Sequence, residues 1–127
     1  KTDRFKAAVV AKPVINWTSF VLYADGAAFF SKYWFGKKPW EDPENYFKRS
    51  PLSYVANITT PTMLLKGEED YRTPIAESEQ FYTALKLEGV ETAMVRIPGA
   101  SHGIANRPSN LIAKIAGVLA WFEKYKE

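Results

Sequence analysis

The sequence predicts an α/β fold built on a parallel β-sheet, and three observations carry this prediction. Three short apolar runs, at residues 7–11, 62–65 and 92–97, are typical of strands. The first two runs are continuously apolar, which favours strands covered on both faces, as in parallel sheets. Helical patterns follow the second and third runs, and strand, helix, strand, helix is the usual order of parallel βαβ units.

Turn and charge signals bound each predicted strand. The first run lies between Lys6 and the pair Lys12-Pro13, the second starts after Pro61, and Pro98-Gly99 ends the third. Between the first two strands, the aromatic residues 17–35 predict two helical pieces broken near Gly26. The proline-rich stretch that follows predicts a loop with a short helix over residues 43–48. Nothing in this segment indicates a linker or a repeat, so we expect one domain or a part of one.

Two longer helices are predicted after the second and third strands. In the first, we expect Thr73 as the N-cap, Pro74 as the first helical residue and Gly89 just beyond the end. The second is expected to start near Ser109. It places five apolar residues at helical spacing: Leu111, Ile115, Val118, Leu119 and Phe122.

Composition excludes several classes of function. The net charge is +3, but the 17 basic residues are scattered, so we do not expect nucleic-acid binding. The absence of cysteine excludes disulfides, thiolate metal sites and a cysteine nucleophile. No metal-ligand cluster or cofactor-binding fingerprint is visible, so we expect neither a metal nor a cofactor. No apolar run is long enough to cross a bilayer, so we expect no membrane partner. A chain without cysteine does not settle the compartment, and we expect a cytoplasmic location as the simpler default.

Two polar loops carry the chemistry, because each follows a predicted strand at the edge where parallel sheets bind ligands. Asp70 lies in the first loop and His102, the only histidine, lies in the second. A carboxylate that orients one imidazole nitrogen lets the other nitrogen act as a base. Simpler interpretations remain: a lone histidine is often structural, Asp70 could favour a helix start, and Glu68 and Glu69 are competing carboxylates.

The stretch "GASHG", residues 99–103, matches the G-x-S-x-G pattern of a nucleophile elbow. In that arrangement an acid and then a histidine follow the serine along the chain. After Ser101 the only carboxylates are Glu123 and Glu127, and no histidine follows His102. We therefore interpret the match as accidental.

Three stretches, "DRFKAAVVAKPVINW", "GEEDYRTPIAESEQFYTAL" and "IPGASHGIANRPSN", resemble the C-terminal part of a catalytic domain of the prolyl oligopeptidase family, in its acylaminoacyl-peptidase and dipeptidyl-peptidase-like branch. The resemblance implies that residues 1–127 are the C-terminal portion of an α/β-hydrolase fold with an incomplete sheet. It further implies that Asp70 is the catalytic acid, His102 the catalytic histidine and Arg72 a brace of the Asp70 loop. Trp17 or Phe20 would line the substrate pocket.

The resemblance also implies a partner. The nucleophilic serine, the oxyanion hole and a β-propeller would lie before Lys1, in a missing N-terminal part of the same serine peptidase. The whole enzyme would hydrolyse short peptides by acyl transfer, and the chain by itself would be inactive. Two alternatives stay open: a part of an esterase or lipase, and a non-catalytic interaction module. The open edge at residues 7–11 predicts self-association.

Overall fold

The computed structural model describes residues 2–126, which form a three-stranded parallel sheet in the order β1-β2-β3. The strands are β1 (Ala8–Ala11), β2 (Thr62–Gly67) and β3 (Thr92–Ile97). Met63 at the centre of the register pairs with Val9 on one side and Ala93 on the other. The outer edge of β1 has no strand beside it among the described residues. The predicted parallel, open sheet is therefore confirmed.

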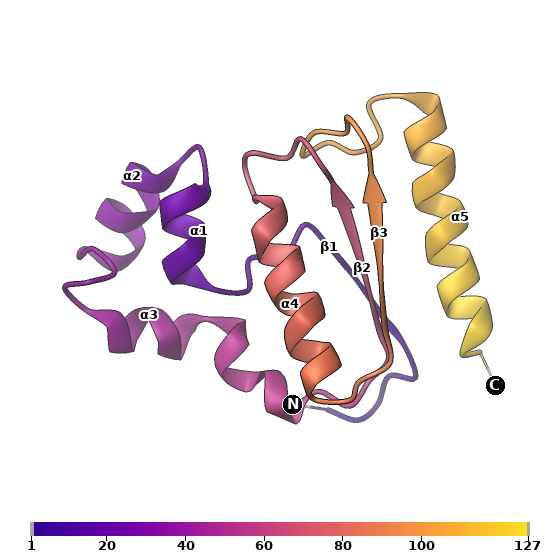
Figure 1. The fold of residues 1–127 in the computed structure, drawn as a ribbon, viewed down its shortest axis with the longest axis horizontal. Helices are drawn as coiled ribbons and strands as arrows, with labels where there is room; N and C mark the ends of the chain where they lie inside the picture. Colours follow the sequence, from indigo (N-terminus) through magenta and orange to yellow (C-terminus); the bar gives the residue numbers. More distant parts are fainter. Residues whose placement is uncertain (1, 127) are drawn as a thin grey trace.

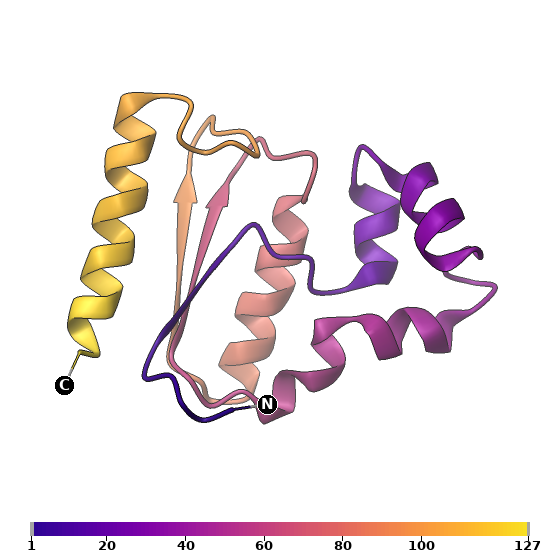
Figure 2. The ribbon, with the colours of Figure 1, turned by 180° about the vertical axis from the view of Figure 1, so that it is seen from behind.

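Two long helices cover opposite faces of this sheet (Figures 1 and 2). They are α4 (Ile75–Leu87) and α5 (Pro108–Lys124). Successive strand residues point to opposite faces, so Leu64 joins a core cluster with Leu85 of α4, while Leu65 joins a second cluster with Ile104. No helix within residues 2–126 combines the length and the apolar character needed to cross a membrane.

The segment between β1 and β2 lies on the far side of α4 from the sheet (Figure 1). It forms α1 (Trp17–Tyr23), α2 (Ala27–Phe30), a π-helical turn η1 (Ser31–Phe35), α3 (Pro43–Arg49) and a 3₁₀ helix η2 (Pro51–Asn57). The predicted break near Gly26 and the helix near residues 43–48 are confirmed. The 3₁₀ helix was predicted as loop, because its short proline-led sequence shows no clear apolar period.

The predicted start of α4 is wrong by one residue. Pro74 is the N-cap and has an extended ψ of 152°, so the helix begins at Ile75. Thr73 makes no cap because its hydroxyl contacts Lys66 and Asp70. At the other end, Gly89 follows the C-cap with φ of +72°, as predicted.

A buried carboxylate fixes the helical segment to α4. Glu77 of α4 accepts hydrogen bonds from the backbone N–H groups of Ile15 and Asn16, each 2.9 Å long, and from the Ser19 hydroxyl. The Asn16 side chain in turn caps α1 by accepting from the N–H of Thr18. These contacts hold the chain between β1 and α1 against α4, close to the loop that carries Asp70.

Candidate active site

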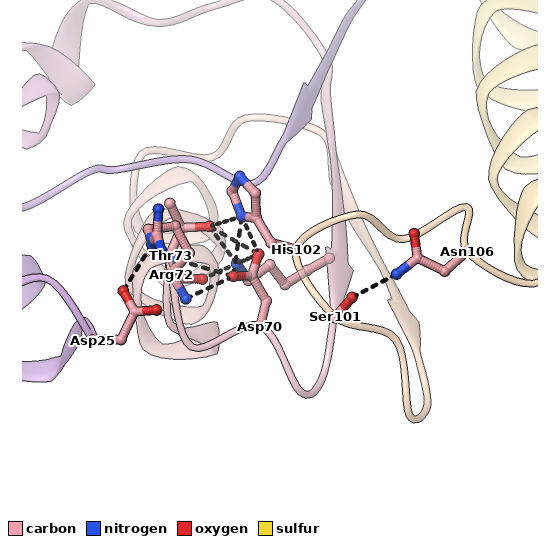
Figure 3. A network of polar contacts seen from close by, with 8 residues as sticks. Asp25, Asp70, Arg72, Thr73, Ser101, His102 and Asn106 are labelled. Carbon is pink, nitrogen blue, oxygen red and sulfur yellow. Dashed lines mark hydrogen bonds and ion pairs between the residues drawn. The ribbon is translucent and has the colours of Figure 1, made fainter.

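The loops after β2 and β3 meet at the carboxyl edge of the sheet, where they bring Asp70 and His102 together (Figure 3). His102 Nδ1 lies 2.9 Å from Asp70 Oδ2 and 3.1 Å from Oδ1. With the proton on Nδ1, the ring donates to the carboxylate and leaves Nε2 able to accept another proton. The His102 side chain is 44% exposed and that of Asp70 is fully buried. This pair has the geometry of an oriented general base.

A glycine at the end of β2 permits this close approach. A Cβ atom on Gly67 would lie 2.3 Å from the carbonyl oxygen of Ala100 and 2.8 Å from that of Ser101. The two loops are also joined by a hydrogen bond from the N–H of Glu69 to the Ala100 carbonyl, 3.0 Å long. Any larger residue at position 67 would therefore displace the loop that carries His102.

Asp70 is held as a charged acceptor. Its Oδ1 accepts from the backbone N–H groups of Arg72 and Thr73, at 3.0 and 2.9 Å, and its Oδ2 accepts from Lys66 Nζ at 2.7 Å. Burial alone raises the pKa of a carboxyl group, but hydrogen bonds from Lys66, Thr73 and His102 outweigh burial and lower the pKa of Asp70 to about 2. The carboxylate is thus ionised at neutral pH.

Lys66 is the site residue that sequence reasoning missed. Its side chain is fully buried, and Nζ contacts Asp70 and both the hydroxyl and the carbonyl of Thr73. Burial lowers the pKa of Lys66, and the hydrogen bond to Asp70 opposes this change. The available signal was a lysine directly after the apolar run at residues 63–65, four positions before Asp70.

Arg72 ties the Asp70 loop to the turn between α1 and α2. Its Nε lies 2.7 Å from Asp25 Oδ1, and the Asp25 N–H donates to the carbonyl of Tyr71 at 3.0 Å. Both charged side chains are largely exposed, so the ion pair adds little stability. These contacts are compatible with the brace expected of Arg72, and that role stays a prediction.

Trp17 and Phe20 do not lie in the pocket beside His102. That pocket encloses about 300 Å³ and is lined by Asp25, Glu69, Tyr71, Arg72, Ser101 and His102. Phe20 is instead buried in the core of the helical segment, and Trp17 packs edge-on against it with ring centroids 5.2 Å apart. Aromatic residues at helical spacing serve packing here, so neither side chain reaches the pocket in this structure.

Ser101 does not have the geometry of an elbow nucleophile. Its hydroxyl is turned away from His102 and accepts a hydrogen bond from Asn106 Nδ2 at 3.0 Å (Figure 3). Among residues 2–126, the only non-glycine residues with positive φ are Lys12 and Ile104, so Ser101 lacks the strained backbone of an elbow. A nucleophile elbow leads directly from a strand into a helix, whereas the helix α5 begins only at Pro108, well after Ser101.

The part of the chain that the structure describes contains no group of three or more histidine and carboxylate side chains able to hold a metal ion.

Comparison with known proteins identifies the family. The model of the prolyl oligopeptidase family matches residues 1–127, the whole chain. The chain belongs to the prolyl oligopeptidase family. Its members are serine peptidases, and the three parallel strands with flanking helices form part of their α/β-hydrolase fold.

Three members of the prolyl oligopeptidase family illustrate the similarity. The chain is 40% identical to the uncharacterized peptidase YuxL of Bacillus subtilis and covers 19% of it, over 98% of its own length. It is 33% identical to the acylamino-acid-releasing enzyme of Arabidopsis thaliana and covers 17% of it, over 97% of its own length. The acylaminoacyl peptidase of Pyrococcus horikoshii superimposes with a TM-score of 0.90 at 31% identity, over 98% of this chain and 21% of that one. The chain thus spans about a fifth of the length of these relatives.

Proposed function

We propose that residues 1–127 supply the base and the orienting acid of a serine peptidase whose nucleophile lies outside this chain. One observation carries the proposal: the ionised, buried Asp70 contacts Nδ1 of a half-exposed His102 at 2.9 Å, at the carboxyl edge of a parallel sheet. In this role His102 is the general base and Asp70 fixes its tautomer. The partner of this edge is the segment that carries the serine and the oxyanion hole.

The reaction is acyl transfer in two halves. The serine hydroxyl attacks the scissile carbonyl while His102 Nε2 takes its proton, and the imidazolium is stabilised through Nδ1–H by the Asp70 carboxylate. His102 then returns the proton to the leaving amine. In the second half, His102 takes a proton from water while the water oxygen attacks the acyl-enzyme carbonyl. His102 then gives this proton to the serine oxygen as the acyl–oxygen bond breaks, which releases the acid product and restores the serine hydroxyl.

The proposed substrates are short peptides, including peptides with an acylated N-terminus. Two observations support this class. Relatives of the chain are named as acylamino-acid-releasing enzymes and acylaminoacyl peptidases. The pocket beside His102, about 300 Å³ in volume, lies at the lower end of the size range of small-molecule sites, which suits a short segment of a peptide.

The first test is intact-mass analysis of the chain after treatment with a fluorophosphonate, which labels activated serines. We expect no adduct, and no turnover of peptide or ester substrates above that of a His102→Ala variant. A stoichiometric adduct at Ser101 would overturn the proposal, because it would make the stretch at residues 99–103 a working elbow.

A second test places the chain in a complete enzyme. Residues 1–127 replace the matching segment of the 40% identical Bacillus subtilis peptidase, and the chimera is assayed with the same probe and with paired amide and ester substrates. His102→Ala should lower kcat by a factor of at least about 1,000. Ser101→Ala is the matched control, one residue away, and should keep the activity. The opposite pattern would assign the chemistry to Ser101.

A further inference from the structure

We propose that Lys66 is a positioning residue of this site: it holds the Asp70 carboxylate ionised and aimed at His102, and it weakens the hold of that carboxylate on the imidazolium proton. This inference rests on the proposed function, in which His102 is the base. Lys66 adds a third charged side chain to the Asp70–His102 pair, and this side chain comes from the end of strand β2 rather than from the two loops.

The contacts of Lys66 lock its ammonium group in place. Nζ has three N–H donors, and it contacts Asp70 Oδ2 at 2.7 Å, Thr73 Oγ1 at 2.7 Å and the Thr73 carbonyl oxygen. The Thr73 hydroxyl in turn donates to Asp70 Oδ2 at 3.0 Å. Because every donor has an acceptor and the side chain is fully buried, the cation cannot turn to solvent.

Oδ2 of Asp70 is therefore shared. It accepts from Lys66 at 2.7 Å, from the Thr73 hydroxyl at 3.0 Å and from His102 Nδ1 at 2.9 Å. A carboxylate already paired with a buried cation attracts a second positive charge less strongly than an unpaired one. The Asp70 carboxylate can still orient the ring through the hydrogen bond, while its stabilisation of the charged imidazolium is reduced.

No other charged group around Lys66 replaces this contact. Glu77 of α4 and Lys12 beyond β1 act on Lys66 only through charge, in opposite directions and without a hydrogen bond. Around His102, the pocket adds Asp25 and Arg72, which pair with each other, and the carboxylate of Glu69. Lys66 thus reaches the imidazole mainly through the Asp70 carboxylate, with a longer second link through the Thr73 hydroxyl, which lies 3.4 Å from His102 Nδ1.

The consequence concerns the working pH of the base. A general base is active only while it is unprotonated. Lys66 moderates the pull of the Asp70 carboxylate on the imidazolium proton. Removing the cation should therefore raise the pH at which half of the imidazole is protonated.

The test uses NMR titration of the imidazole protons, which are unambiguous because the chain has one histidine. Lys66→Met keeps the length and the apolar stem of the side chain but removes the charge. We expect it to raise the titration midpoint of His102 by about one pH unit. Lys86→Met, which removes an exposed cation from α4, is the matched control and should leave the midpoint unchanged. An unchanged midpoint in Lys66→Met would overturn the inference.

A double-mutant cycle separates this inference from the proposed function. Asp70→Asn should lower the midpoint. Adding Lys66→Met to Asp70→Asn should raise the midpoint by less than Lys66→Met does in the unaltered chain, because the part of the effect that passes through the carboxylate is gone and only direct repulsion between the two cations remains. If Asp70→Asn leaves the midpoint unchanged, the pair itself and the proposed function fail. If Asp70→Asn lowers the midpoint and Lys66→Met has no effect, only the role of Lys66 fails.

A measurement on the unaltered chain covers the case in which Lys66→Met does not fold. With ¹⁵N-labelled lysine, the buried ammonium of Lys66 should give a slowly exchanging NH₃⁺ signal at neutral pH. Its ¹⁵N shift should move with the same midpoint as His102, since both groups share Oδ2. Absence of this charged signal, or a signal that ignores the titration of His102, would overturn the inference.

Discussion

The two βα units of the sheet differ in how completely they are packed. The unit β2–α4, whose loop carries Asp70, buries all six residues of its strand and the side chains of Glu77, Ser78, Phe81 and Leu85 on its helix. The unit β3–α5, whose loop carries His102, buries only Trp121 on a helix of 17 residues. Yet α5 is the more apolar helix of the two.

This difference suits the two roles proposed for the site. The proposed orienting acid, Asp70, has to stay fixed and ionised, and the well-packed β2–α4 unit (the closed unit) gives it a buried position with hydrogen bonds to both oxygens. The proposed base, His102, has to exchange protons with reacting groups, and the less packed β3–α5 unit (the open unit) leaves 44% of its side chain exposed. An orienting acid gains from burial, whereas a base has to remain accessible.

The open unit also presents an apolar surface. Five side chains of α5 are between 44% and 70% exposed: Leu111, Ile112, Ile115, Leu119 and Phe122. The sequence predicted apolar residues at helical spacing along α5, and the described residues cover only part of this apolar face. A contiguous apolar face of this kind is typical of a contact surface.

The largest contrast is expected from one leucine in each helix. Leu85→Ala on α4 removes a fully buried side chain and should lower the free energy of unfolding by about 2 to 5 kcal/mol. Leu119→Ala on α5 removes a side chain that is 63% exposed and should cost less than about 0.5 kcal/mol. Urea unfolding measures both. Equal losses would show that α5 is as well packed as α4 in solution.

One glycine from each unit gives the next contrast. Gly67→Ala places a Cβ 2.3 Å from the Ala100 carbonyl oxygen and should destabilise the fold by about 1 to 3 kcal/mol. It should also shift the NMR signals of His102. Gly117→Ala in α5 meets nothing closer than 3.8 Å and should stabilise the helix by roughly 0.5 to 1 kcal/mol. The comparison is wrong if Gly67→Ala is neutral.

The third prediction concerns how low pH lowers the stability of the closed unit by protonating Asp70. The pKa of this carboxyl falls from 3.8 to about 2 on folding, so its contribution, about 2 kcal/mol, is present above the unfolded pKa and is lost as pH falls toward the folded value. Between about pH 6 and pH 2, unfolding free energy should therefore fall about 2 kcal/mol further in the unaltered chain than in the double variant Lys66→Met, Asp70→Asn, which lacks both charges. If the unfolding free energies of the two proteins fall equally with pH, the stabilising role assigned to the Asp70 carboxylate is wrong.

The smallest effect on stability is expected at the open surfaces. The N–H groups of Ala8 and Lys12 donate to the carbonyls of Pro61 and Leu65, so the alternating N–H of Val9 points away from β2. We expect the chain to self-associate through this edge and the α5 face. Val9→Pro and Leu119→Lys should each lower the apparent mass in concentrated solution, as light scattering would report.

Leu87→Lys is the control for that measurement, because Leu87 is 82% exposed on α4 and belongs to the closed unit. It should leave association unchanged. A monomeric unaltered chain at high concentration would contradict the proposed self-association. Equal effects of Leu87→Lys and Leu119→Lys would show that association is not specific to the open unit.

Local patterns were sufficient to predict the strands and the two long helices, and to place an acidic loop and His102 at one edge of the sheet. The reason is that parallel strands joined by helices place the loops that follow them at one edge. The choice of Asp70 over the neighbouring glutamates came from the resemblance to the prolyl oligopeptidase family. Reasoning from local patterns failed at Thr73, because a threonine before Pro74 looks like a helix cap, and its hydroxyl is used by Lys66 and Asp70 instead. A cap is a local choice, and a distant partner overrode it.

The sequence by itself determined the class of fold, the order of its elements and the residues available for acid–base chemistry, since backbone preferences and apolar periods are written over short stretches. Only the tertiary structure decided which side chains are buried together. It placed Lys66 against Asp70, Phe20 inside the helical core and the apolar face of α5 in solvent. Burial depends on residues far apart in the chain, and so do the charges and contacts that tune the site.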